Sequence, residues 1–254
     1  MQKRALVRRP GPRLADGLVT HIPRTGIDGD LALRQWQGYV DALRAEGWET
    51  IEVPPADDCP DAVFVEDTVV VHGDLAVVSR PGADERRPET AGTEKTLAAL
   101  GYRIARIDAP GTLDGGDVLK HDGTVWVGLG GRTNEAGLAQ LAALLAPLGA
   151  EVVSVPVTRV LHLKSGVTAL PDGTVIGFEP LVDDPAAWPA FLAVPEEEGS
   201  PVVLLDGTTV LMSSSAPATR ALLEARGLRV VAVDVTEFEK LEGCVTCLSV
   251  RLRG

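Results

Sequence analysis

The segment Asp122-Gly-Thr-Val-Trp-Val-Gly128 decides the fold, because a two-residue turn leads there into an apolar strand and the same pattern recurs along the chain. Glycine supplies the positive φ angle that a tight hairpin turn requires. Each copy therefore predicts a β-hairpin. The other copies are His72-Gly-Asp-Leu-Ala-Val-Val78, Asp172-Gly-Thr-Val-Ile-Gly177 and Asp206-Gly-Thr-Thr-Val-Leu211.

A helical pattern follows each hairpin and usually leads to a third strand. The expected helices cover residues 94–100, 134–148, 184–192 and 216–226, and the third strands cover 102–107, 151–155 and 229–233. The unit is therefore ββαβ, present four times. The two chain ends supply a fifth unit: strands at 4–8, 50–53 and 248–252, and a helix at 31–46 with Asp30 as its N-cap.

Repeated units that cannot cover their own apolar faces pack around a common axis. The sequence thus predicts an α/β fold of pseudo-repeated ββαβ units, closed into a single domain over residues 1–254. An open doubly wound sheet would place a glycine-rich phosphate loop after the first strand, and no such loop follows residues 4–8.

Composition narrows the class of partner. The chain has 254 residues, a net charge of −12 and no basic run, which disfavours nucleic acid and suits a cationic small molecule. No apolar run reaches the ~18 residues that a membrane span needs. The basic first residues lack the apolar core of a signal peptide. With three cysteines and no export signal, the expected location is the cytoplasm.

Two of the three cysteines, Cys244 and Cys247, stand near the C-terminus, just before and at the start of the last expected strand. A structural zinc site needs about four ligands, and the other Cys and His residues are scattered. A thioredoxin-like pair would open a helix, whereas this one leads into a strand-like pattern. Cys247 is then either a small buried core residue or a nucleophile.

Clustered carboxylates precede the first hairpin. In Asp61-Ala-Val-Phe-Val-Glu-Asp67, Glu66 and Asp67 lie between apolar, strand-like residues. Solvated loop acids are the ordinary interpretation of such a cluster. Charges inside an apolar strand need compensation, however, and a bound cation would supply it.

Three further features complete the candidate site. In Leu113-Asp-Gly-Gly-Asp-Val-Leu119, the paired glycines indicate a sharp turn or a close backbone approach, although Asp-Gly is also a common hairpin turn. Arg132 precedes a helix N-terminus, an unfavourable place for a cation. A lone histidine is more often structural, but His162 and Cys247 could form a proton carrier and nucleophile, with an acid orienting the imidazole.

Five motifs together resemble the dimethylarginine dimethylaminohydrolases of the guanidino-group-modifying enzyme superfamily. The resemblance covers nearly the whole chain and implies a five-bladed α/β propeller, which fits the repeat. Arginine deiminases share the chemistry, but they are longer and carry Asp where this chain has Lys164. Some bacterial members of the family use Glu where this chain has Asp114. The motifs are Phe64-Val-Glu-Asp67, Leu113-Asp-Gly-Gly-Asp-Val118, Gly131-Arg-Thr-Asn134, His162-Leu-Lys-Ser165 and Gly243-Cys-Val-Thr-Cys247.

The resemblance implies hydrolysis of Nω-methylated L-arginines to citrulline and dimethylamine or methylamine, through a covalent S-alkylthiouronium intermediate. It implies no metal and no organic cofactor, and it leaves the oligomeric state open, with a homodimer as one option. The implied catalytic residues are Cys247 as nucleophile, His162 as proton carrier and Asp114 as the acid that orients it. The implied substrate-binding residues are Glu66 and Asp67 for the guanidinium, Arg80 and Arg132 for the α-carboxylate, and Asp61 with the main chain of Leu18 for the α-ammonium.

Three alternatives remain open at this stage. A related hydrolase could act on unmodified arginine or another guanidino compound, because one methyl group changes binding by only about 1–3 kcal/mol. A propeller of the same shape could bind a cationic amino acid without cleaving it. A redox or zinc protein could use Cys244 and Cys247. These alternatives differ in whether citrulline forms and in whether metal or a disulfide is present.

Overall fold

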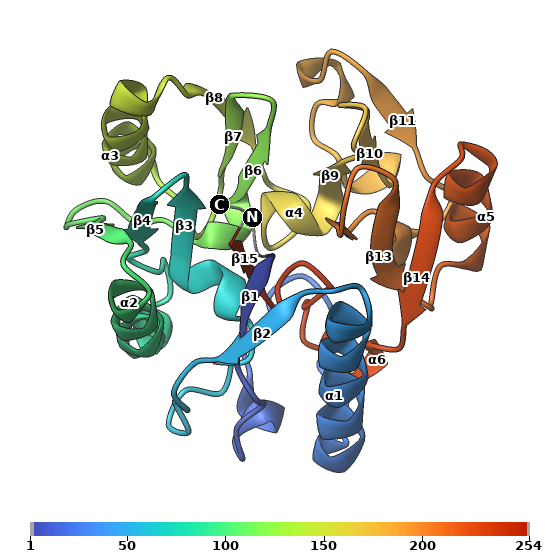
Figure 1. Cartoon of the computed structure of the whole chain (residues 1–254), viewed down its shortest axis with the longest axis horizontal. Coiled ribbons are helices and arrows are strands. Elements are labelled where there is room, and N and C mark those ends of the chain that lie inside the picture. Colours follow the sequence, from blue (N-terminus) through green and yellow to red (C-terminus); the bar gives the residue numbers. More distant parts are fainter. Residues whose placement is uncertain (1–2, 253–254) are drawn as a thin grey trace.

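The structure is a computed structural model that describes residues 3–252, and it contains five three-stranded sheets arranged around a common centre (Figure 1). The sheets are β15 (Val250–Leu252), β1 (Arg4–Val7) and β2 (Glu49–Glu52); β3 (Val69–His72), β4 (Leu75–Val78) and β5 (Arg103–Arg106); β6 (Val118–His121), β7 (Thr124–Leu129) and β8 (Glu151–Pro156); β9 (Val167–Ala169), β10 (Val175–Gly177) and β11 (Phe191–Ala193); β12 (Val202–Leu204), β13 (Thr209–Ser213) and β14 (Arg229–Val233).

Helices connect the strands, and α1, α2, α3 and α5 lie on the outer side of the sheets, whereas α4 lies near the centre (Figure 1). The α-helices are α1 (Gly29–Ala45), α2 (Thr90–Ala99), α3 (Glu135–Leu145), α4 (Leu163–Gly166), α5 (Pro217–Ala225) and α6 (Thr236–Glu239). The 3₁₀ turns are η1 (Leu14–Asp16), η2 (Val65–Thr68), η3 (Asp84–Glu89), η4 (Gly115–Asp117), η5 (Ala146–Leu148), η6 (Glu179–Leu181), η7 (Pro185–Ala187) and η8 (Glu197–Gly199).

Each sheet follows one rule of pairing. The middle strand pairs antiparallel with the first strand and parallel with the third, as in β3-β4-β5 and β6-β7-β8. The remaining blade joins the two ends of the chain, because β15 pairs antiparallel with β1 and β1 pairs parallel with β2. The predicted five-bladed α/β propeller, with one blade assembled from both termini, is therefore confirmed.

One expected helix is wrong. Residues 184–192 form only the short turn η7 and then enter strand β11. Asp184 caps that turn by accepting a hydrogen bond from the Ala186 backbone N–H, and two prolines, at 185 and 189, limit helical hydrogen bonding. The blade β9-β10-β11 therefore keeps its three strands but lacks the outer helix.

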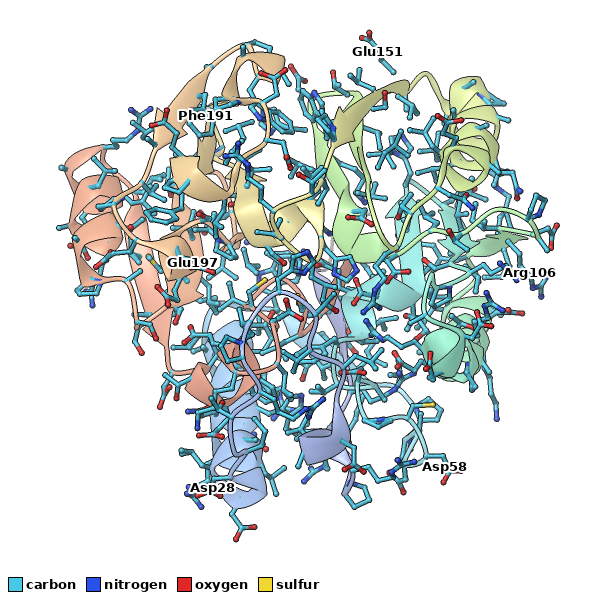
Figure 2. The ribbon with its side chains drawn as sticks, turned by 180° about the vertical axis from the view of Figure 1, so that it is seen from behind. Asp28, Asp58, Arg106, Glu151, Phe191 and Glu197 are labelled. Atoms are coloured by element: carbon cyan, nitrogen blue, oxygen red, sulfur yellow. The ribbon has the colours of Figure 1, made fainter. Side chains whose placement is uncertain are left out.

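The N-terminal helix begins two residues earlier than the sequence predicts. Asp28, labelled in Figure 2, is the N-cap, and its carboxylate accepts a hydrogen bond of 2.9 Å from the Leu31 backbone N–H. Asp30 lies in the first turn, where its charge suits the helix dipole. The buried face includes Trp36 and Leu43, whereas Leu33 is 36% exposed.

The cores are small and lie within and between blades. Leu6 of β1 is fully buried in a cluster that includes Val250 of β15, Val69 of β3 and Leu97 of α2. This cluster joins the blade made from the two chain ends to its neighbour. Among residues 3–252, no helix combines the length and the apolar character that a bilayer crossing demands.

We expect Leu6→Ala to lower the free energy of unfolding by about 2–5 kcal/mol, because it leaves a cavity where two blades meet. Leu33→Ala is the matched control, since the same atoms are removed from a partly exposed site and the expected change is within about 0.5 kcal/mol. Urea unfolding measures both. Equal losses in the two variants would contradict this account of how the propeller closes.

Candidate active site

Six of the nine sequence-predicted site residues line one small buried cavity. They come from segments far apart in the chain, so the fold itself assembles the site. The lining residues are Leu18, Asp61, Phe64, Asp67, Arg86, Arg132, Leu161, His162, Leu241, Glu242, Gly243 and Cys247. Of the other three predicted residues, Asp114 lies directly behind His162, Glu66 borders a neighbouring cavity, and Arg80 lies elsewhere.

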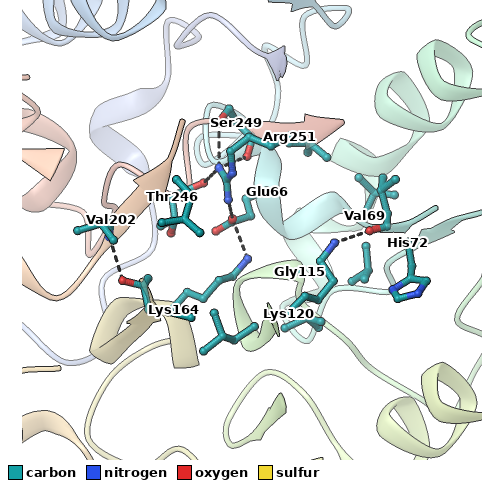
Figure 3. Close-up of a pocket in the computed structure, with 18 of the residues that line it drawn as sticks. Glu66, Val69, His72, Gly115, Lys120, Lys164, Val202, Thr246, Ser249 and Arg251 are labelled. Atoms are coloured by element: carbon teal, nitrogen blue, oxygen red, sulfur yellow. Dashed lines mark hydrogen bonds and ion pairs between the residues drawn. The ribbon is translucent and has the colours of Figure 1, made fainter. Parts of the chain in front are cut away.

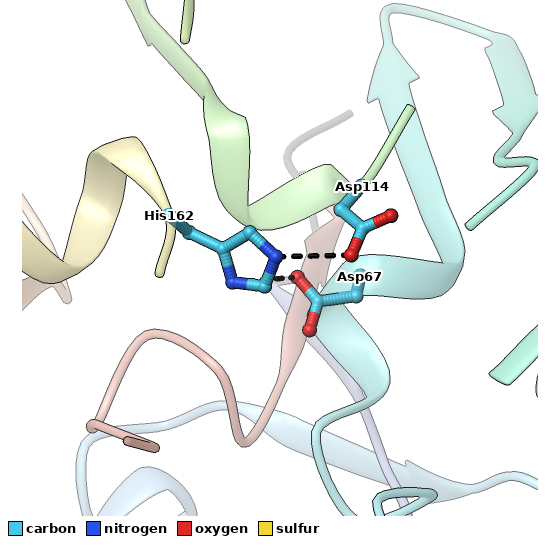
Figure 4. Close-up of side chains that lie close together, drawn as sticks. All are labelled: Asp67, Asp114 and His162. Atoms are coloured by element: carbon cyan, nitrogen blue, oxygen red, sulfur yellow. Dashed lines mark hydrogen bonds and ion pairs between the residues drawn. The ribbon is translucent and has the colours of Figure 1, made fainter. Parts of the chain in front are cut away.

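His162 is held between two carboxylates (Figure 4). Its Nε2 is 2.9 Å from Asp114 Oδ2, and its Nδ1 is 3.7 Å from Asp67 Oδ1. Burial alone would lower the pKa of His162, but the charge of Asp67 and the hydrogen bond with Asp114 raise it to about 9. At neutral pH the imidazole is therefore protonated and can act as an acid.

The carboxylate of Asp67 contacts Arg86, the Gly116 backbone and His162. Burial opposes its charge, but His162 and Arg86 lower its pKa to about 2. Its Oδ2 accepts a 2.7 Å hydrogen bond from Arg86, and its Oδ1 accepts a 2.8 Å bond from the Gly116 backbone N–H. Asp67 thus remains ionised beside the imidazolium.

The paired glycines make this approach possible, as the sequence indicated. A Cβ at Gly116 would stand 2.6 Å from Asp67 Oδ1 and 2.8 Å from His162 Cγ. A Cβ at Gly115 would stand 2.0 Å from the Glu66 carbonyl oxygen. All three distances are too short for a real Cβ atom, so only glycine lets these segments pack together.

Glu66 and Asp67 both lie within the turn η2, which interrupts the expected strand, and they line different cavities. Glu66 Oε1 lies 2.7 Å from Lys164 Nζ and 2.7 Å from Arg251 Nη2, in a cavity of about 300 Å³ beside the blades' inner strands (Figure 3). Its Oε2 is buried and has no hydrogen-bond partner. One oxygen of Glu66 is therefore bound by protein cations, and the other remains available.

Cys247 lies in a turn before β15 rather than on the strand itself, which corrects the sequence prediction. Its N–H donates to the Cys244 carbonyl at 3.1 Å, and its own carbonyl accepts from the Glu66 N–H at 3.1 Å. Its Sγ lies 3.3 Å from Cys244 Sγ. The hydrogen bond with Cys244, burial and the charges of Glu66 and Asp67 all raise the pKa of Cys247 above its usual range. In the absence of a bound ligand, this thiol stays protonated at neutral pH.

Arg132 and Asp61 bring opposite charges to the cavity. Arg132 Nη1 is buried without a hydrogen-bond partner, and its closest acid is Asp114, whose Oδ2 is 3.8 Å away. Asp61 accepts from the Leu18 backbone N–H at 3.1 and 3.2 Å, and burial raises its pKa. A zwitterionic ligand would satisfy both groups.

Arg80 does not line this cavity, so the structure does not bring it together with the other residues predicted to bind the ligand. Its Nη1 donates to the Gly111 carbonyl at 3.1 Å. Arg86 lines the cavity instead, where it also forms a 2.8 Å ion pair with Glu89. Sequence reasoning missed Arg86 because Glu85-Arg-Arg87 has the composition of an exposed charged turn.

Comparison with known proteins decides the family. The chain is 64% identical over 251 residues to the N(G),N(G)-dimethylarginine dimethylaminohydrolase of Streptomyces coelicolor, covering 99% of this chain and 97% of that protein. The chain belongs to the dimethylarginine dimethylaminohydrolase family. No protein-family model matches the sequence.

Solved structures of the dimethylarginine dimethylaminohydrolase family share the fold. One is a cysteine-to-serine variant of the Pseudomonas aeruginosa enzyme in complex with citrulline, with a TM-score of 0.92 at 33% identity. Another is a histidine-to-glycine variant in an adduct with S-methyl-L-thiocitrulline, with a TM-score of 0.92 at 32% identity. Each comparison covers 99% of this chain and 100% of the other.

Within this family member, Asp117 supports the site from behind, and the sequence analysis did not single it out. It is 1% exposed, and it accepts from the Leu163 N–H at 3.0 Å and from Thr133 Oγ1 at 2.6 Å. Burial raises its pKa to about 6. Because Leu163 follows His162, Asp117 fixes the backbone that carries the imidazole. Its place beside the paired glycines was the available signal.

Asp67, Asp114 and His162 also form the one group among the described residues whose side chains could together hold a metal ion, with ligand atoms within 4.8 Å of one another. Their lone pairs are largely engaged, however. Asp67 binds Arg86 and Gly116, and Asp114 Oδ1 accepts from the Gly82 N–H at 2.8 Å. The charged imidazole of His162 already lies between Asp67 and Asp114, where a metal cation would have to bind. This donor set fits a clamp for histidine better than a metal centre.

We expect the contribution of His162 to stability to depend on pH. Its folded pKa of about 9 exceeds the ordinary 6.5, so the stabilisation is complete below pH 6.5 and is lost as pH rises through about 9. Urea unfolding of the wild type and of His162→Asn, compared from pH 6 to about 10, isolates the contribution of His162 to the free energy of unfolding. The stability advantage of the wild type should shrink across that window. A constant or growing advantage would contradict the clamp.

Proposed function

We propose that this protein hydrolyses Nω-methylated L-arginines, asymmetric dimethylarginine and monomethylarginine, to citrulline and dimethylamine or methylamine. The observation that carries the proposal is the meeting of Cys247, protonated His162 and the carboxylate of Asp67 at one buried cavity. The identity of 64% to a dimethylarginine dimethylaminohydrolase over almost the whole chain supports the substrate class.

The substrate's guanidinium lies against acids. A guanidinium keeps its charge at neutral pH, and its burial without partners would cost several kcal/mol. Asp67 stays ionised, and Glu66 Oε2 is a buried acceptor without a partner. Charge-assisted hydrogen bonds to these oxygens offset the loss of water and orient the central carbon toward Cys247.

The amino-acid end of the substrate lies against Arg132, Asp61 and Leu18. The unpartnered Nη1 of Arg132 suits the α-carboxylate, since a buried donor without an acceptor is costly. Asp61 and the main chain of Leu18 receive the α-ammonium. Arg86 is already bound to Asp67 and Glu89, so Arg132 is the cation that recognises the carboxylate.

The first step forms a bond between sulfur and carbon. The hydrogen bond with Cys244, burial and nearby acids raise the pKa of Cys247, and the substrate's positive charge lowers it. Once the substrate is bound, the thiol therefore releases its proton to solvent water and becomes a thiolate. Sulfur attacks the guanidinium carbon, and the C–N bond to the methylated nitrogen breaks. The leaving amine takes a proton from His162, whose Nδ1 is free because Nε2 is bonded to Asp114.

The second step is hydrolysis. The product of the first step is an S-alkylthiouronium on Cys247, and His162 has lost its proton. The neutral imidazole then accepts a proton from water, which attacks the same carbon. The C–S bond breaks, citrulline forms, and the cysteine is regenerated. A free thiol is essential throughout, and all three cysteines are unpaired, which fits action in a reducing cytoplasm.

Citrulline release tests the substrate and the nucleophile together. We expect purified protein to release citrulline faster from asymmetric dimethylarginine than from arginine. Cys247→Ser should reduce this rate by at least about 10³-fold, whereas Cys59→Ser, a buried cysteine outside the cavity, should retain it. Faster turnover of plain arginine would overturn the substrate assignment. An absence of citrulline from either substrate would favour a binding protein.

If Arg132 binds the α-carboxylate of the substrate, its replacement should raise KM more than the same replacement of Arg80. Arg132→Gln should raise KM for asymmetric dimethylarginine about 10- to 100-fold, because a hydrogen bond between charged groups contributes about 1.5–3 kcal/mol. Arg80→Gln makes the same chemical change outside the cavity and should alter KM less than about twofold. Steady-state kinetics distinguishes them. A larger KM effect from Arg80 would restore the sequence-based assignment.

A further inference from the structure

The second cysteine of the turn, Cys244, has no role in the chemistry above, yet it lies against the nucleophile. The two sulfur atoms are 3.3 Å apart, and a disulfide bond needs about 2.05 Å. The hydrogen bond from the Cys247 N–H to the Cys244 carbonyl closes a four-residue turn. Such a turn keeps the first and last Cα atoms within about 7 Å, which overlaps the range found in disulfides.

The two thiols face different cavities. Cys247 is 4% exposed and lines the small substrate cavity. Cys244 is only partly buried and lines a separate cavity of about 260 Å³, which also contains His21 and Arg159. Glu242 and Gly243 line both cavities and lie between them. A small reagent can therefore reach Cys244 without entering the substrate cavity.

We propose that Cys244 is a modification site for small hydroperoxides, and that its oxidation leads to a reversible disulfide with Cys247. The thiolate of Cys244 attacks the peroxide, the O–O bond breaks, and Cys244 becomes a sulfenic acid while the peroxide is reduced to an alcohol or water. The sulfur of Cys247 then attacks the sulfur of Cys244, the S–O bond breaks, and the departing hydroxyl combines with the thiol proton of Cys247 to leave as water.

Local contacts assign the first step to Cys244. The hydrogen bond from Cys247 lowers the pKa of Cys244, and Thr246 Oγ1 lies 3.2 Å from its sulfur and adds to that effect. The hydrogen bond between the two thiols, burial and the charges of Glu66 and Asp67 raise the pKa of Cys247. The thiolate is the form that reacts with peroxide. Cys244 therefore reacts first, and Cys247 resolves the sulfenic acid.

The disulfide would switch off hydrolysis and protect the nucleophile. Once bonded to Cys244, the sulfur of Cys247 cannot attack a guanidinium carbon. It also cannot advance to sulfinic or sulfonic acid, which thiols do not reverse. The loss of activity in this scheme rests on the proposed function, but the disulfide itself does not.

Mass spectrometry tests the bond without using activity. Cleavage after Lys240 and Arg251 gives a peptide of residues 241–251 that carries both cysteines and no other. After treatment of the protein with hydrogen peroxide and blocking of free thiols, we expect this peptide unblocked and about 2 Da lighter than its reduced form. Dithiothreitol should restore the reduced mass. A peptide that gains only oxygen, on either cysteine, would overturn the proposal.

Activity and a matched pair of variants test the order of events. Wild type and Cys59→Ser should lose at least about tenfold in activity with peroxide and recover it with dithiothreitol. Each variant is compared with its own activity before oxidation. Cys244→Ser should lose activity more slowly and should not recover it. A wild-type rate of loss with full recovery in Cys244→Ser would contradict the role of Cys244, whatever the mass spectrum of the wild type shows.

Discussion

The arrangement of the site depends on one constraint: the imidazole of His162 is clamped between Asp67 and Asp114. Two acids around one buried ring keep it charged, and they fix which nitrogen remains free for the substrate. The clamp closes only because Gly116 has no side chain to separate Asp67 from His162. The hydrogen bond with Cys244, burial and the charges of Glu66 and Asp67 raise the pKa of Cys247 in the absence of a ligand. The resting protein thus holds a charged imidazole and a neutral thiol at one cavity. In the proposed mechanism, a cationic substrate favours the thiolate form of Cys247.

The propeller explains why residues so distant in sequence converge. Asp67 lies in η2 just before β3, Asp114 precedes η4 and β6, His162 precedes α4 and β9, and Cys247 precedes β15. Each stands at the entrance to the first strand of its blade. Because the blades repeat around one axis, these entrances meet at the same end of the axis. A closed ring of blades is therefore both the source of stability and the device that brings four separate segments to one cavity.

Much of this could be predicted from the sequence, because the repeat and the five motifs are local signals. The turns at Asp122 and Asp172 predict hairpins directly, and the glycines before Asp117 predict a close approach. What failed has two kinds of cause. Arg86 resembles a surface residue until Asp67 and Glu89 are placed around it by the fold. The helix expected over 184–192 is replaced by a capped turn for local reasons, the Asp184 cap and two prolines. Sequence spacing also did not reveal that one oxygen of Glu66 is bound by Lys164 and Arg251.

The central claim is that sulfur of Cys247 attacks the substrate carbon with His162 beside it. Rapid acid quench of the reaction with asymmetric dimethylarginine, followed by mass spectrometry of residues 241–251, tests it most directly. The account predicts a transient adduct on Cys247 that appears before citrulline and decays as citrulline accumulates. An adduct on Cys244, or citrulline formed at full rate with both thiols unmodified at every time point, would contradict it.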